Sequence, residues 1–156
     1  MRVTLCVVGR LRAGPERELI DDYITRFDRT GRALGLGPID VREVEDRKGG
    51  GMAAEATLLE KALPSGAVVV ALDERGKVKT SPEFANDLAR WRDDGRQDVA
   101  FIIGGADGIA PALRARVDAK LSFGKMVWPH MMVRVMLTEQ LYRAASILAG
   151  SPYHRV

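Results

Sequence analysis

The chain has 156 residues, of which 46% are apolar and 29% are charged, a balance ordinary for one globular domain over residues 1–156. Its formal net charge of +3 neither requires nor excludes a nucleic-acid partner. Its apolar runs are too short for a membrane span, and MRVTLCVVGR is too short in its apolar part for a secretory signal. We therefore expect a cytoplasmic protein without membrane contact. One cysteine and two histidines also give no reason to expect a disulfide or a metal site.

Strand and helix patterns alternate from the first residues onward. Residues 3–8 are apolar throughout and end at Gly9, which is typical of a strand buried on both faces. Gly14-Pro15 begins a helix, and Gly31 lies where a capping glycine is expected. Residues 39–44 predict a second, more highly charged strand.

The middle of the chain repeats this alternation. Helices and strands are predicted in turn over residues 52–63, 67–72, 81–95 and 99–103. Ser81 is the expected N-cap of its helix, and the polar segment 73–80 is expected to lead away from the preceding strand. Alternation of this kind predicts an α/β fold, a mostly parallel sheet with helices on both faces.

The segment FIIGGADGIAP places Gly104, Gly105 and Gly108 directly after the strand at 99–103. A dinucleotide fingerprint requires G-x-G-x-x-G early in the fold, and a Walker loop ends in G-K-[ST], so neither phosphate motif is present. Taken by itself, the segment is best explained as a strand-to-helix turn that needs the backbone freedom of glycine.

The residues after this turn favour a ligand-binding site. Leu121 to Pro129 is another apolar segment, so strands ending after Leu72, Ile103 and Phe123 could form three walls of one pocket. Ligands of open α/β sheets bind at the carboxyl ends of strands. Glycines at 104, 105 and 124 would let the main chain approach such a ligand closely.

A helix predicted over residues 131–149 is apolar around most of its circumference. Such a helix must be covered on more than one side. A second subunit could cover the remaining apolar side, and on that basis we predict a homodimer. The alternative is that this helix lies at the centre of the chain's own core.

Several motifs in the C-terminal third occur together in a known family. They are Gly104-Gly105-x-x-Gly108, Leu121-Ser122-Phe123-x-Lys125-Met126, Pro129-His130, Val133-Arg134-Val135, Glu139 to Ala144 and Pro152-Tyr153-His154-Arg155. With LDERGK at residues 72–77, this series resembles the RlmH family of SPOUT methyltransferases over the whole chain.

The resemblance implies a C-terminal trefoil knot, which sequence rules would not predict because chains hardly ever thread loops. It also implies a homodimer and an S-adenosylmethionine pocket. Residue matching assigns cofactor binding to Leu72, Gly104, Phe123, Gly124, Lys125, Met126, Val127 and Trp128. The implied reaction is methylation of N3 of a pseudouridine in 23S ribosomal RNA of assembled ribosomes.

Roles for the tail follow from that resemblance. Tyr153 is expected to stack on the base, and Arg155 and Arg134 to contact phosphates or the developing charge. His154 is expected either to take the N3 proton or to orient the base. His130 is interpreted as structural, and Glu139 with Arg143 as an ion pair one helical turn apart.

Two alternatives stay open from the sequence. One is a SPOUT methyltransferase that acts on another RNA such as tRNA, which the Tyr153-His154-Arg155 ending disfavours. The other is a non-catalytic ribosome-binding factor with the same fold. The intact glycines at 104, 105 and 108 argue against that factor, because loss of a cofactor would relax the need for them.

Overall fold

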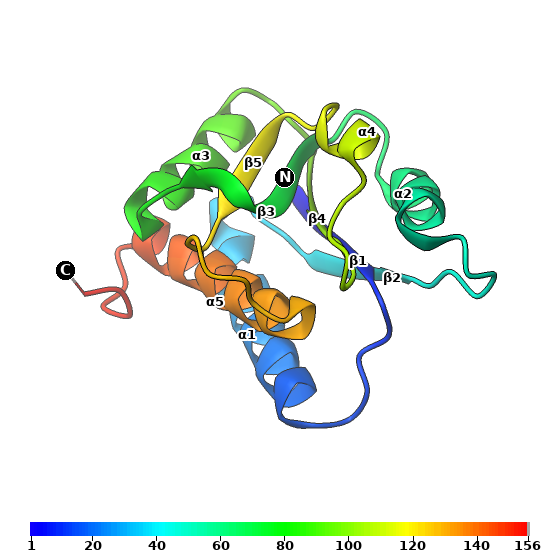
Figure 1. The fold of residues 1–156 in the computed structure, drawn as a ribbon. Coiled ribbons are helices and arrows are strands. Elements are labelled where there is room, and N and C mark those ends of the chain that lie inside the picture. Colours follow the sequence, from blue (N-terminus) through cyan, green and yellow to red (C-terminus); the bar gives the residue numbers. More distant parts are fainter. Residues whose placement is uncertain (156) are drawn as a thin grey trace.

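The computed structural model describes residues 1–155 and is built on one five-stranded parallel sheet in the order β2-β1-β4-β3-β5 (Figure 1). The strands are β1 (Arg2–Val8), β2 (Ile39–Val44), β3 (Val68–Val78), β4 (Asp98–Ile103) and β5 (Ala119–Ser122). The helices are α1 (Pro15–Gly31), the short 3-10 turn η1 (Arg32–Leu34), α2 (Gly51–Ala62), α3 (Ser81–Asp93), α4 (Pro111–Arg114) and α5 (His130–Ala149).

Helices cover both faces of the sheet, as the sequence predicted. On one face, Val3, Leu5 and Val7 pack with residues of α1, α3 and α5 in the larger hydrophobic cluster. On the other face, Cys6 and Val8 pack with residues of α2 and α4. The side chains of β1 alternate between the two clusters because successive residues of a strand point to opposite faces. The continuous apolar run of β1 therefore reflects burial on both sides.

The strand β3 is longer than predicted. Residues 73–78 do not leave the sheet: the ladder to β5 breaks after Leu72 and resumes at Lys77, which pairs with Leu121. The residues between form a bulge, and a side chain at Gly76 would lie 2.8 Å from the backbone of Lys120. The polar segment is thus held against the end of the sheet by backbone pairing.

Two predicted helix ends are wrong by a few residues. Gly31 is the last residue of α1 with a helical φ of −70°, and the left-handed capping residue is Gly35, after η1. Gly31 is needed for close packing instead, since a Cβ there would lie 2.6 Å from the carbonyl oxygen of Leu36. The N-cap of α3 is Thr80, not Ser81, because Thr80 and Glu83 form a reciprocal capping box.

The helix α5 packs against both α1 and α3, which accounts for much of its apolar circumference within one chain. Its buried residues include Leu137 and Leu141 on the sheet side and Ala144 and Ala145. None of the helices within residues 1–155 is long and apolar enough to cross a membrane. The predicted dimer and the trefoil knot both stay predictions.

Candidate active site

A cavity of about 700 Å³ lies where β4 and β5 end and where the strand between them, β3, bulges after Leu72. Leu72 and Asp73 line it from β3, Ile103 and Gly104 from β4, and Phe123 from the segment after β5. The structure thus brings together the three positions that the sequence placed around one pocket, although β3 does not end after Leu72 as predicted but continues beyond its bulge. Its volume is in the range of sites for small molecules and cofactors.

The turn after β4 forms one wall of this cavity. The amide of Gly108 donates to the carbonyl oxygen of Gly105 at 3.0 Å, which closes the turn. A Cβ on Gly104 would lie 2.6 Å from the backbone carbonyl of Gly108, so the main chain approaches itself too closely for any side chain there. Gly108 itself has a φ of 83°, a conformation that favours glycine. Both glycines are therefore required by the shape of the cavity wall.

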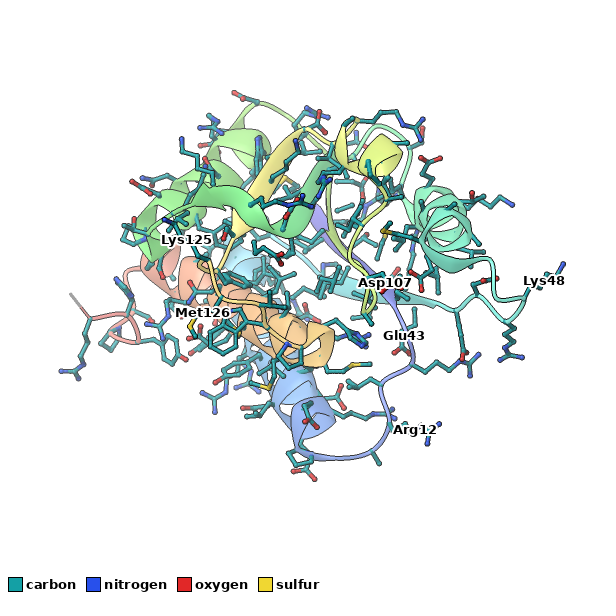
Figure 2. All side chains as sticks on the ribbon, viewed as in Figure 1. Arg12, Glu43, Lys48, Asp107, Lys125 and Met126 are labelled. Carbon is teal, nitrogen blue, oxygen red and sulfur yellow. The ribbon has the colours of Figure 1, made fainter. Side chains whose placement is uncertain are left out.

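The segment between β5 and α5 forms a second wall. Of the eight residues matched to cofactor binding, seven line the cavity: Leu72, Gly104, Phe123, Gly124, Met126, Val127 and Trp128. Lys125 is not among the lining residues. Figure 2 shows Lys125 and Met126 on this segment, where it crosses α5. Met126 and Val127 are each 76% exposed, so the wall has apolar surface that the chain leaves uncovered.

Charged groups line the rest of the cavity. Asp73, in the β3 bulge, is nearly buried and is paired with Arg114 at 3.3 Å and with Arg75 at 3.5 Å. Glu55 reaches the glycine turn from α2, where its carboxylate oxygens lie 3.2 and 3.4 Å from the position of a Cβ on Gly105. Burial, followed by the charge of Asp107, raises the pKa of Glu55. The cavity lining thus combines Asp73 and Asp107 with Arg75 and Arg114, while Glu55 lies beside the glycine turn without lining the cavity.

Sequence reasoning missed His130 as a cavity residue. It is the first residue of α5, it lines the cavity, and its Nδ1 atom is buried without a hydrogen-bond partner within the described chain. Its ring also packs close to Gly9 at the end of β1. The sequence does contain a signal that could have placed His130 in the cavity: it directly follows the segment 121–129, which is predicted to line the pocket.

Arg134, one of the expected site residues, is buried in the interior of the chain. Its side chain is 2% exposed and forms an ion pair at 2.9 Å with Glu43, at the end of β2. It also donates to the carbonyl oxygen of Gly9 at 3.2 Å, while the amide of Leu11 donates to Glu43. Within one chain Arg134 therefore fixes the loop after β1 to α5, and its expected contact with phosphate or developing charge stays a prediction.

The tail residues form a network on the outer surface of α5. Arg143 pairs with Glu139, which confirms the expected ion pair, and the hydroxyl of Tyr153 donates to the same carboxylate at 2.9 Å. Burial and this hydrogen bond raise the pKa of Tyr153. Arg143 also contacts Nδ1 of His154 at 3.2 Å. Tyr153 and His154 are thus anchored to α5, in contrast to the residues of a frayed chain end.

The tail does not lie among the residues that line the cavity of its own chain. Glu139, which accepts the hydrogen bond from Tyr153, is nine residues beyond the cavity residue His130 on α5. About 13 Å of helix therefore separates the cavity from the point where the tail is bound. Figure 1 shows α5 running from the region of the glycine turn toward the C-terminus at the far side of the molecule. One chain therefore presents a cavity and a tail as separate features.

Comparison with known proteins identifies the class of this α/β protein. The chain belongs to the SPOUT methyltransferase family, since the family model described as "Predicted SPOUT methyltransferase" matches residues 1–154. Relatives named "Ribosomal RNA large subunit methyltransferase H" are 74% identical in Dinoroseobacter shibae and 72% identical in a Ruegeria species, each over all 156 residues and the full length of both chains. These relatives confirm the resemblance to the RlmH family and establish the chain as a methyltransferase.

Solved structures agree with the fold. A probable methyltransferase from Bordetella pertussis Tohama I has a TM-score of 0.52 at 15% identity, covering 92% of this chain and 94% of its own. A probable methylase family protein from Haemophilus influenzae Rd KW20 has a TM-score of 0.50 at 12% identity, covering 99% of this chain and 70% of its own. At such low identity the similarity concerns the fold.

Proposed function

We propose that this protein transfers a methyl group from S-adenosylmethionine to N3 of a pseudouridine in the 23S ribosomal RNA of assembled ribosomes. The observation that carries the proposal is the cavity at the ends of β4 and β5 and the bulge of β3, lined by seven of the eight residues matched to cofactor binding. The full-length relatives named as large-subunit ribosomal RNA methyltransferases support the choice of substrate.

The cavity suits S-adenosylmethionine in both shape and chemistry. The tight turn at Gly104 and Gly108 places main-chain groups in the cavity wall, and Leu72, Ile103 and Trp128 offer apolar surface for an adenine ring. The carboxylates near the turn, Asp107 among them, suit a cationic ligand. When bound, S-adenosylmethionine supplies an electrophilic methyl group on a sulfonium.

The protein's contribution to the reaction is positioning and charge stabilisation. Methylation of N3 forms a nitrogen–carbon bond as the sulfur–methyl bond breaks, and the N3 proton leaves to solvent. The negative charge of the imide is shared by the two carbonyl oxygens beside N3, so hydrogen-bond donors directed at those oxygens lower the barrier. Tyr153, His154 and Arg155 are the proposed base-contacting group, with Tyr153 offering an aromatic ring for stacking.

We further propose that the working enzyme is a homodimer in which the tail of one protomer serves the cavity of the other. Within one chain the tail is bound to α5 away from the cavity. The exposed apolar side chains of Met126, Val127, Trp128 and Met132 lie beside the cavity and at the start of α5, which suits an interface there.

A mixed dimer tests this arrangement. One protomer would carry Gly104→Ala and the other His154→Ala, with different affinity tags so that mixed dimers can be purified. At limiting cofactor, we expect each single-variant dimer to be about 100-fold slower than the wild type. The mixed dimer should retain about half of the wild-type activity, because one of its two symmetry-related sites is intact. A mixed dimer as slow as its parents, or a monomer in sedimentation at micromolar concentration, would contradict the shared site.

The function itself is tested by supplying labelled S-adenosylmethionine to three acceptors: ribosomes lacking the modification, free ribosomal RNA, and tRNA. We expect label in the large-subunit RNA of intact ribosomes. Label in tRNA alone would favour the alternative RNA substrate. A folded protein that labels none of the three would favour a non-catalytic ribosome-binding factor.

A further inference from the structure

The side chain of His154 is held by a chain of contacts that begins at Glu139. The Oε1 atom of Glu139 accepts from Nε and Nη2 of Arg143 at 2.9 and 2.5 Å. The Nη1 atom of Arg143 then lies 3.2 Å from Nδ1 of His154. The guanidinium also sits over the ring of Tyr153, 4.8 Å from its centroid. Arg143 is therefore held on two sides before it reaches the imidazole.

This geometry has a consequence for the proton on His154. A guanidinium has only donors, so a hydrogen bond to Nδ1 requires that Nδ1 be the acceptor. In a neutral imidazole the proton is then on Nε2. We propose that Glu139 and Arg143 are positioning residues that fix His154 as the Nε2–H tautomer, so that its free edge presents a hydrogen-bond donor to the target base.

The proposal rests on the proposed function and assigns His154 one of the two roles expected for it. A donor at Nε2 can bind a carbonyl oxygen beside N3 and stabilise the negative charge that develops when the N3 proton is lost. The ring cannot take that proton at Nε2, which already carries one. It could take a proton at Nδ1 only by giving up the contact with Arg143. His154 therefore orients and stabilises the base, and the N3 proton leaves to solvent.

The contacts around Arg143 and His154 come from two parts of the chain: α5 with the tail, and α1. From α5 and the tail come Glu139, Arg143 and Tyr153. From α1, Tyr23 stacks on Tyr142 at 6.4 Å and Arg26 lies 5.8 Å from the Tyr142 ring. Tyr142 in turn packs against Tyr153 at 4.6 Å. The network is thus supported by aromatic packing as well as by the ion pair.

The tautomer can be measured directly in the full-length protein by nitrogen-15 NMR of the imidazole side chains. The chain has two histidines, so the His154→Ala variant identifies the remaining signals as those of His130. We expect wild-type His154 at pH 8 to be the Nε2–H tautomer without a detectable Nδ1–H form, and the Arg143→Met variant to show a mixture of both tautomers, because a free imidazole populates both. Tyr153→Phe is the matched control, because it removes a contact to Glu139 while leaving Arg143 beside His154. An Nδ1–H tautomer in the wild type, or an unchanged tautomer in Arg143→Met, would overturn the proposal.

Activity provides a second readout that a purely structural role would not affect. Glutamine places an amide donor near the position of Nε2, whereas asparagine places one near Nδ1. We expect His154→Asn and His154→Ala to lower kcat about 100-fold, as removal of one charge-stabilising donor does, and His154→Gln to stay within about tenfold of the wild type. A His154→Gln enzyme as slow as His154→Ala would contradict the donor role. If the wild type methylates no RNA, the proposed function fails, while the NMR measurement still decides the tautomer.

Discussion

A Gly104→Ala protein is expected to bind S-adenosylmethionine about 100-fold more weakly than the wild type, the upper part of the range for overpacking a close contact. The added methyl group would lie 2.6 Å from the backbone carbon and oxygen of Gly108 and 3.0 Å from the side chain of Ile109. Because backbone atoms cannot rotate away, the turn itself must move. That movement changes the cavity wall at the point proposed to hold the cofactor. Isothermal titration calorimetry measures the change in dissociation constant.

The control for this substitution is Gly95→Ala, after α3. Gly95 has a φ of 82° and nothing within 4 Å of its Cβ position, so alanine there is strained by about 1–2 kcal/mol but changes no cavity. We expect Gly95→Ala to lower stability and leave cofactor affinity unchanged. If Gly104→Ala bound the cofactor as well as Gly95→Ala does, the assignment of this cavity would be wrong.

Replacing Arg134 by methionine is expected to lower the free energy of unfolding by about 3 kcal/mol, the lower end of the range for breaking a buried ion pair. The lower end applies because Glu43 is 33% exposed and stays partly hydrated. The change also removes the donor to the carbonyl oxygen of Gly9. The surface control Arg17→Met, which breaks an exposed pair with Asp21, should cost at most about 0.5 kcal/mol. Urea denaturation measures both; equal effects would contradict the structural role of Arg134.

The pH dependence of stability shows whether Arg134→Met acts by breaking the ion pair with Glu43 or only by removing side-chain packing. Burial raises the pKa of Glu43, but the hydrogen bonds from Arg134 and the Leu11 amide outweigh burial, so the pKa is lowered overall. A carboxyl whose pKa is lowered by folding stabilises the protein above its unfolded value, about 4.3, and loses that contribution as the pH falls through the folded value. Arg134→Met should therefore lose more stability at pH 7 than at pH 3. An equal loss at both pH values would indicate packing alone.

The sequence predicted the sheet because its strands are short apolar runs separated by helix signals, and burial on both faces leaves little ambiguity in such runs. It failed where polar residues are held by backbone pairing. Residues 73–78 are polar, yet β5 pairs with Lys77 and Val78, and Gly76 lets the two backbones approach. Pairing between distant segments of this kind has no local signal.

In the site, too, some residues could be predicted from the sequence and others could not. The walls after Leu72, Ile103 and Phe123 were predictable because strand ends of a parallel sheet meet at one edge. The burial of Arg134 was not, since its partner Glu43 is 91 residues away and no local pattern joins them. His130 was also missed because its position depends on distant parts of the chain. It lines the cavity because α5 begins there, and the place where α5 begins is set by the packing of the whole fold.

The most direct test of the account is nucleoside analysis of large-subunit RNA after ribosomes lacking the modification are incubated with the enzyme and S-adenosylmethionine. Mass spectrometry of the digested nucleosides distinguishes a methyl group on the base from one on the ribose. We predict one new nucleoside, a pseudouridine methylated at N3, which Gly104→Ala forms much more slowly than the wild-type enzyme at cofactor concentrations near the wild-type dissociation constant. A methyl group on a ribose hydroxyl or on another base, or product formation by Gly104→Ala at the wild-type rate under these conditions, would contradict the account.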